Sequence, residues 1–258
     1  MIDVLTASQL VEQAKEELRN TFGSADIPVT IPPELVLETR RVADGEGYGF
    51  LRPLYFPLGE TRLDLPTPSG WKKLNPWFFK QMTGNRPNIS SDVAKIGAYW
   101  TLFDESERPE FAGDEKFGLI LTSGREMDNI KVPSYLKYLS MTARNGVSMK
   151  EQANFVFPEL AKPLRLVDHI AQGLVVIRRP KAAEFNYAGN LRYEHLGRDS
   201  TFEGFDDVFG GDSCFVGGSY VGGGLGSIYY RWTDDHDGEL VFRPLIVFLS
   251  QPQSLVTW

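Results

Sequence analysis

Four acidic residues that could do the chemistry of a hydrolase stand in the C-terminal third of the chain, among aromatic residues and glycines. They are Glu203, Asp206, Asp207 and Asp212. Enzymes that cleave glycosidic bonds use a pair of carboxylates, one to protonate the leaving group and one as base or nucleophile. The pattern makes these four residues candidate catalytic groups, and it requires that two of them converge in a cleft. Acidic residues beside glycine turns are more often simply solvated.

Three residues in the middle of the chain have side chains suited to nucleic acid. They are Lys150, Gln152 and Asn154, on a predicted helix that follows the turn Asn145-Gly146. In a helix-turn-helix this second helix reads the major groove, where glutamine and asparagine can pair with adenine edges. However, a buried aliphatic residue is expected where Gln152 stands, and the chain is acidic. An ordinary helical hairpin is therefore the favoured interpretation.

Glycine makes up nine of the 23 residues from Gly204 to Gly226. A dinucleotide-binding glycine loop must open a helix, whereas the segment that follows, Ser227-Ile228-Tyr229-Tyr230, has the composition of a strand. We therefore expect these glycines to form turns and bulges between short strands that carry aromatic side chains. No cofactor is predicted.

Two further patterns lack the partners that their chemistry needs. Asp234-Asp235-His236-Asp237-Gly238 begins like a calcium loop, but Pro244 stands where the closing glutamate is required. No metal site is predicted. Gly211-Asp212-Ser213 resembles the nucleophile segment of trypsin-like serine proteases over three residues, but Cys214-Phe215 follows where that family has two glycines. A solvated hairpin turn and a capping turn explain these segments.

The charge balance and the cysteine content bear on partners and location. Lys and Arg number 27 and Asp and Glu 34, which gives a net charge of −7 at pH 7. An acidic chain disfavours broad electrostatic capture of nucleic acid or of an anionic membrane. Cys214 is the only cysteine, as is usual in a reducing compartment, and no apolar run has the length of a membrane span. We expect a soluble, cytoplasmic protein with no membrane partner.

The elements that must position these residues mix helices and short strands. Thr6 to Gln9 fits a capping box ahead of an amphipathic helix that stops at Gly23, and Asn75-Pro76 is a typical start for a short helix. Residues 133–144 and 149–162 are expected to form a helical pair, and 34–42 either a helix or an edge strand. Strands are expected within 48–65 and at 116–122, 164–167, 174–179, 227–232, 239–242 and 245–249, and a turn-rich segment at 184–197.

This order of elements predicts an α+β fold with a short-stranded, mostly antiparallel sheet. An N-terminal amphipathic helix and a central helical pair pack on it, and the glycine-rich C-terminal third is β-structured. We expect a single domain over residues 1–258, with the charged segment 104–115 as the place where it would divide.

No catalytic set is complete, so the leading hypothesis for function is a non-enzymatic interaction or assembly protein. It would act through protein–protein contacts, with itself or with another protein, using the aromatic residues and glycines of the C-terminal third. The alternatives are a carboxylate-dependent hydrolase of a glycan-like substrate and a nucleic-acid-associated protein with a helix-turn-helix-like hairpin.

Overall fold

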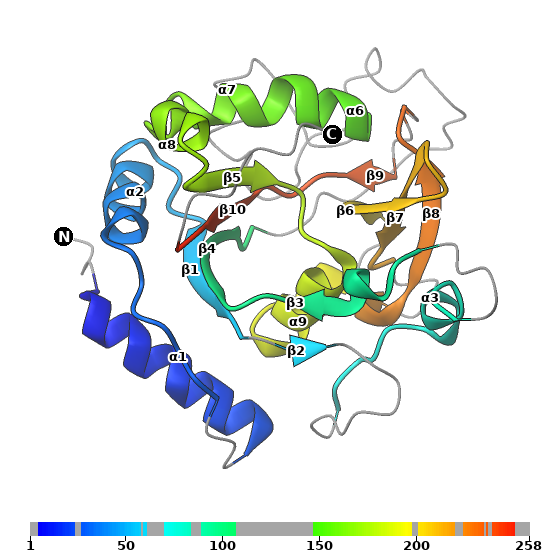
Figure 1. Cartoon of the computed structure of the whole chain (residues 1–258), viewed down its shortest axis with the longest axis horizontal. Helices are drawn as coiled ribbons and strands as arrows, with labels where there is room; N and C mark the ends of the chain where they lie inside the picture. The colour runs from blue at the N-terminus through cyan, green and yellow to red at the C-terminus, as the bar shows by residue number, and fades with distance from the viewer. Residues whose placement is uncertain are drawn as a thin grey trace.

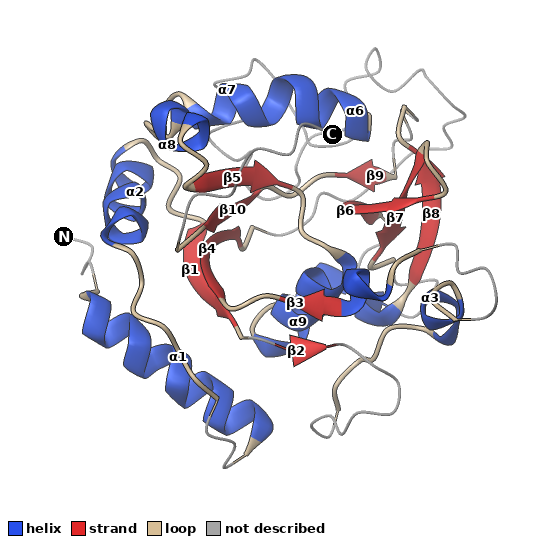
Figure 2. Cartoon of the chain, viewed as in Figure 1, coloured by secondary structure: helices blue, strands red, loops and turns tan. Residues whose placement is uncertain are grey.

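A computed structural model describes the chain as an α+β fold, as the sequence predicts (Figures 1 and 2). The description covers most of the chain in several ranges. These are residues 5–23, 27–57, 59–60, 70–83, 89–106, 147–197, 201–219, 224–234, 236 and 239–250. The expected helix at 133–144, the expected strand at 116–122 and most of the segment 104–115 lie outside these ranges.

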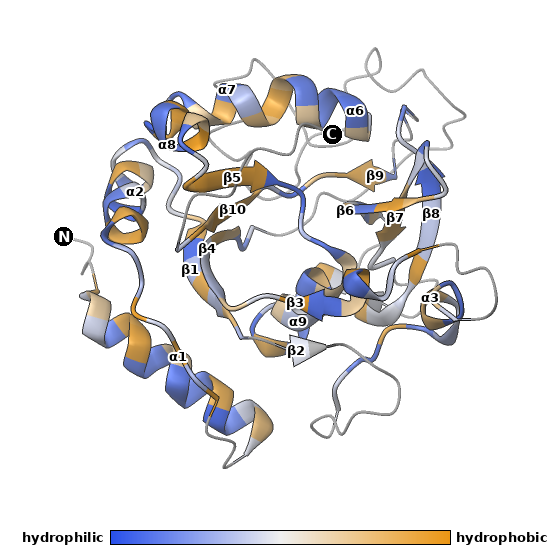
Figure 3. Cartoon of the chain, in the orientation of Figure 1, coloured by the Kyte–Doolittle hydropathy of each residue, from blue (hydrophilic) through white to orange (hydrophobic). Residues whose placement is uncertain are grey.

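The first sheet holds the two halves of the described chain together. Its strands are β1 (Leu51–Phe56), β4 (Tyr99–Asp104), β10 (Leu245–Phe248) and β5 (Val175–Arg178), antiparallel throughout and in the order β1-β4-β10-β5. Residues 245–248 are buried without alternation, as befits an inner strand with both faces covered. Figure 3 shows β10 and β5 as mostly hydrophobic ribbons.

The second sheet contains the glycine-rich residues. Its strands are β8 (Ile228–Trp232), β7 (Ser213–Gly217), β6 (Phe202–Phe209) and β9 (Leu240–Val241), in the order β8-β7-β6-β9 with only the β6–β9 pair parallel. The β6–β7 register shifts between Gly204 and Val208, and Gly210 and Gly211 in the connecting turn have φ of 64° and 93°. Left-handed values of this kind favour glycine, so the expected turn and bulge are present here.

The two faces of the second sheet belong to different hydrophobic clusters. Phe205 and Phe215 join the large core cluster, which also contains residues of the first sheet. The opposite face forms a small cluster with Met149 at its edge. The members of this small cluster are Met149, Phe202, Cys214, Val216 and Leu240.

Helices cover the sheets and fill the space between them (Figure 1). The longer ones are α1 (Ala7–Phe22), α2 (Glu34–Gly45) and α9 (Ala182–Leu191), with α3 (Pro76–Lys80), α6 (Met149–Glu151), α7 (Phe157–Ala161) and α8 (Val167–Ala171) as short ones. Turns of 3-10 helix lie at Ser91–Ala94, Glu194–Gly197 and Gly224–Gly226, and β2 (Gly59–Glu60) pairs with β3 (Lys95–Ile96). No helix among the described residues combines the length and the apolar character that crossing a membrane requires.

Local capping chemistry begins several helices where the sequence predicts. Thr6 forms the capping box with Gln9 at the start of α1, and Asn75 caps α3 with proline in its first turn. Ser148 forms a second capping box at the start of α6. The expected helix 149–162 is present as α6, a π-helical turn at Gln152–Val156 and α7. Pro158 lacks an N–H and crowds the preceding turn, which accounts for the widened helix.

Gly217 provides a test of how tightly the second sheet is built. A Cβ at this position would lie 2.1 Å from the carbonyl oxygen of Ser227, which is backbone and cannot move aside. We predict that Gly217→Ala lowers the free energy of unfolding by about 1–3 kcal/mol, measured by chemical denaturation. Gly45→Ala is the control because a Cβ there meets nothing within 4 Å. Equal stability of the two variants would contradict this packing.

Candidate functional site

Glu203 lies in a fully buried ion pair with Arg243, and both residues are 0% exposed. Arg243 Nε lies 3.1 Å from Oε1 and 3.0 Å from Oε2 of Glu203, and Nη2 lies 2.8 Å from Oε1. Nη1 donates to the carbonyl oxygens of Asp104 and Ser106, the latter at 2.8 Å. Glu203 belongs to β6 and Asp104 to β4, so this guanidinium joins the two sheets. Glu203 is therefore a structural anchor without access to solvent.

Asp206 and Asp207 lie at the first turn of α9. Asp207 is 5% exposed and accepts a hydrogen bond of 2.7 Å from the backbone N–H of Ala182. Burial raises the pKa of this carboxyl to about 7. Asp206 is partly exposed and lies 3.6 Å from Arg179 and 3.9 Å from Arg178. Asp207 therefore caps the start of α9, and Asp206 lies beside the arginines at the end of β5.

Glu184 completes this buried network, and the sequence reasoning did not single it out. Its carboxylate accepts two hydrogen bonds of 2.7 Å from Arg178 and one of 2.6 Å from the backbone N–H of Lys181. The hydroxyl of Tyr99 also donates to it. Burial and the charge of Glu184 raise the pKa of Tyr99 well above its usual value. The signal available in the sequence was the pair Arg178-Arg179 at the end of an apolar strand, because buried guanidinium groups need carboxylates.

The four candidate carboxylates do not converge on a cleft. Glu203 faces Arg243, Asp207 caps α9 and Asp212 is exposed in the turn after Gly211. The cavity of about 380 Å³ beside α1 is lined by none of them. Within the described ranges, no group of three or more His, Cys, Asp or Glu side chains is placed to hold a metal ion.

The three residues suited to nucleic acid do not share one surface. Lys150 and Asn154 are exposed, whereas Gln152 is 0% exposed and donates through Nε2 to the carbonyl oxygen of Val147 at 2.7 Å. An amide held in this way is not available to a base edge. Gln152 therefore occupies the buried position at which the sequence favours an aliphatic residue, and its amide nitrogen is bonded internally.

Four aromatic residues meet at one end of the second sheet, and we call them the aromatic face: Trp77, Phe209, Tyr230 and Trp232. Trp77 of α3 stacks on Tyr230 with ring centroids 6.0 Å apart, and Phe209 stacks on Tyr230 at 4.7 Å. Trp232 shares this face because it pairs with Ser213, which in turn pairs with Phe209. Figure 1 shows α3 packed beside β8. These side chains continue the core-facing side of the second sheet to its solvent-exposed end.

The aromatic face is exposed and has acidic neighbours. Tyr230 is 45% and Trp232 57% exposed, while Trp77 and Phe209 are half-buried. Asp212 and Asp234 are exposed beside it, because the N–H of Thr233 bonds to the carbonyl oxygen of Asp212 at 2.9 Å and brings the two strand ends together. The surface combines large apolar rings with negative charge.

Comparison with protein-family models, with curated sequences and with solved structures finds no match to this chain.

The buried pair of Glu203 and Arg243 gives a first prediction. Glu203→Gln keeps the shape of the side chain but removes the closer of the two carboxylate charges beside a fully buried guanidinium, the other being Asp104 at 3.6 Å. We expect a loss of about 3 kcal/mol in the free energy of unfolding. Glu159→Gln makes the same change in the exposed pair with Lys162, and the expected loss is below about 1 kcal/mol. Comparable losses in urea denaturation would show that the buried pair is not an anchor.

Asp207 gives a second prediction, which concerns pH. Its pKa is about 7 in the folded chain, above its ordinary 3.8. Between these values the folded state holds a proton that the unfolded state has released. The contribution of Asp207 to stability is therefore fully present below about pH 4 and falls as the pH rises to about 7, by up to about 1.4 kcal/mol per unit.

Asp207→Asn removes this titration and keeps an acceptor for the N–H of Ala182. Its free energy of unfolding, relative to the unaltered chain, should be higher at about pH 8 than at about pH 5. Asp212→Asn, at an exposed turn, is the matched control and should show no such change. A pH-independent difference between Asp207→Asn and the unaltered chain would contradict the buried, protonated carboxyl.

Proposed function

We propose that this chain is a non-enzymatic interaction protein that binds a protein partner through the aromatic face. The supporting observation is that Tyr230 stays 45% exposed although Trp77 and Phe209 stack on its ring, and that Trp232 on the same face is 57% exposed. Aromatic residues are enriched in the energetic centres of protein interfaces. Rings already ordered by stacking lose little conformational entropy on binding, which favours affinity.

The partner is a protein segment that carries arginine or lysine next to an apolar residue. Asp212 and Asp234 supply negative charge at the edge of the aromatic face, and the chain as a whole carries −7. A cationic side chain gains by stacking over Trp232 or Tyr230 and by approaching these carboxylates. A second copy of this acidic chain is repelled by the same charges, so a different chain is the favoured partner.

The two alternatives have less support. A hydrolase needs two carboxylates beside a substrate, whereas Glu203 and Asp207 are bound to internal partners and Asp212 is in a separate turn. A helix that reads DNA needs Gln152 at its surface, and this side chain is buried.

The setting that we propose is the cytoplasm. Cys214, the only cysteine in the chain, is buried, and burial raises the pKa of its thiol to about 11. A thiol of this kind is unreactive and packs as a small apolar side chain, which suits a compartment where disulfides are not used.

Peptide binding tests the proposal. The probes are labelled peptides that alternate arginine with leucine, and the same peptides with glutamate in place of arginine, followed by fluorescence anisotropy. The basic peptides should bind, with an affinity that falls as salt is added, and the acidic peptides should not. Trp232→Ala should weaken binding by at least about tenfold.

Phe155→Ala is the matched control. Phe155 is 66% exposed and belongs to the π-helical turn, outside the aromatic face, so its loss should leave peptide binding unchanged. Equal effects of the two substitutions, or equal binding of acidic and basic peptides, would reject the aromatic face as the binding surface. Sedimentation of the free chain distinguishes self-association, which would point to a second copy as the partner.

A further inference from the structure

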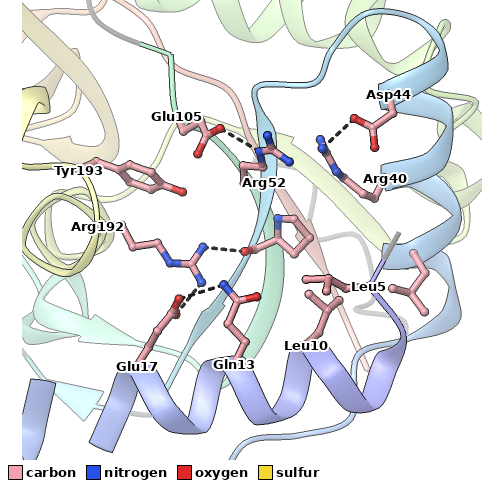
Figure 4. Close-up of a pocket in the computed structure, with 12 residues that line it drawn as sticks. Leu5, Leu10, Gln13, Glu17, Arg40, Asp44, Arg52, Glu105, Arg192 and Tyr193 are labelled. Carbon is pink, nitrogen blue, oxygen red and sulfur yellow. Dashed lines mark hydrogen bonds and ion pairs between the residues drawn. The ribbon is translucent and has the colours of Figure 1, made fainter. Parts of the chain in front are cut away.

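A cavity of about 380 Å³ lies between α1, α2, β1 and the residues after α9 (Figure 4). Its volume is in the range of sites for small ligands. Figure 4 shows Leu5 and Leu10 toward one end, where Arg40 and Asp44 also lie. Arg192 and Tyr193 lie at the other end, the polar end, where the carbonyl oxygen of Pro53 accepts from Arg192. The cavity therefore suits a small molecule that has an apolar part and a polar part.

The polar end holds hydrogen-bond donors that the protein does not use. Tyr193 is only 6% exposed, and among the described residues its hydroxyl has no hydrogen-bond partner. Figure 4 shows this hydroxyl pointing into the cavity between Glu105 and Arg192. The Nε of Arg192 is likewise without a partner in the described ranges. A buried donor left unpaired costs roughly 1–3 kcal/mol, so both groups favour a ligand that accepts hydrogen bonds.

The protonation of Tyr193 is suited to this role. Burial raises the pKa of its phenol, the nearby Glu105 carboxylate raises it further, and Arg192 lowers it. The phenol therefore remains an O–H donor at neutral pH. Its ring is held in place by stacking on Phe103 at 5.4 Å, with 3° between the ring planes. A ligand would meet a donor that is already oriented.

The charges that line the cavity balance. Arg40 pairs with Asp44 at 2.7 Å, Arg52 with Glu105 at 2.9 Å, and Arg192 with Glu17 at 2.5 Å. A ligand with a net charge would leave that charge uncompensated in a partly buried site. A ligand that carries both signs meets guanidinium donors and a carboxylate acceptor together, because Arg52 and Glu105 both line the cavity.

We propose that this cavity binds a small zwitterion with an apolar side chain, of the class of the apolar α-amino acids. The ligand carboxylate accepts from Tyr193, from Arg52 and from Nε of Arg192. Its ammonium group donates to Glu105, and its side chain lies against the leucines at the other end. This site is separate from the aromatic face and does not depend on the function proposed for it.

Ligand binding in this cavity has a consequence for α1. Leu10 and Glu17 belong to α1, whereas Arg52, Glu105 and Tyr193 belong to the body on which it docks. A ligand that contacts both sides adds to the pair of Glu17 with Arg192 in holding the helix down. Backbone amides of α1 should therefore exchange more slowly with solvent when the cavity is occupied.

Isothermal titration calorimetry of the full chain tests the ligand class, with L-leucine and L-phenylalanine as the probes. N-acetyl-L-leucine lacks the ammonium charge and L-leucinamide lacks the carboxylate. We expect L-leucine to bind with a millimolar or lower Kd, and each leucine analogue to bind at least about tenfold more weakly than L-leucine. No binding of either amino acid, or an analogue as strong as L-leucine, would overturn it.

Variants test the location. Tyr193→Phe keeps the stacked ring and removes the hydroxyl, and it should weaken amino-acid binding by about tenfold without a change in melting temperature large enough to indicate unfolding. Tyr229→Phe removes a hydroxyl outside the cavity and is the matched control. Arg52→Gln provides a second variant at a more exposed position should the first not fold. Unchanged affinity, or unchanged exchange in α1 on adding the amino acid, would place the ligand elsewhere.

Discussion

The described fold depends on one buried guanidinium. Arg243 lies between β9 and β10, where the chain passes from the second sheet to the first, and it reaches Glu203 on one side and the end of β4 on the other. A charge in such a place is tolerated only when its donors are all directed at acceptors. The pair therefore fixes where the two sheets meet, and the large core cluster packs around that junction.

The same principle operates at α9, and together the two networks contain three of the four candidate carboxylates, Glu203, Asp206 and Asp207. Arg178 and Arg179 emerge from the apolar strand β5 into a space where Glu184, Asp206 and Asp207 receive them or cap the helix. Tyr230, Trp232 and the aliphatic Val208 stay exposed on the second sheet.

Predictions of secondary structure were correct where local hydrogen bonds determine it and wrong where tertiary contacts determine it. The caps at Thr6 and Asn75 are short-range, and both were predicted and are present. The turn-rich prediction for 184–197 was wrong, since most of α9 lies there. Its Asn186 donates to the carbonyl oxygens of Lys72 and Leu225 at 2.6 and 3.0 Å, and a side chain at Gly189 would meet Leu225. Asn186 and Gly189 are of types that favour turns, but in α9 they allow close packing.

The strand expected at 164–167 was also wrong, because Arg165 adopts φ of 59° and the chain turns into α8. The charged partners of the candidate carboxylates could not be predicted from the sequence, for a different reason. Glu203 and Arg243 are 40 positions apart, and no spacing rule connects an acid in β6 with a base that follows β9. The cavity beside α1 likewise depends on α1, β1 and the end of α9, which meet only after folding.

The small cluster around Cys214 is enclosed apart from the large core, and the chain has no second cysteine. A thiol reagent added to the native chain would therefore react with Cys214 only when this layer beneath α6 opens locally and exposes the thiol. The rate of this reaction would report the local opening of one face of the second sheet.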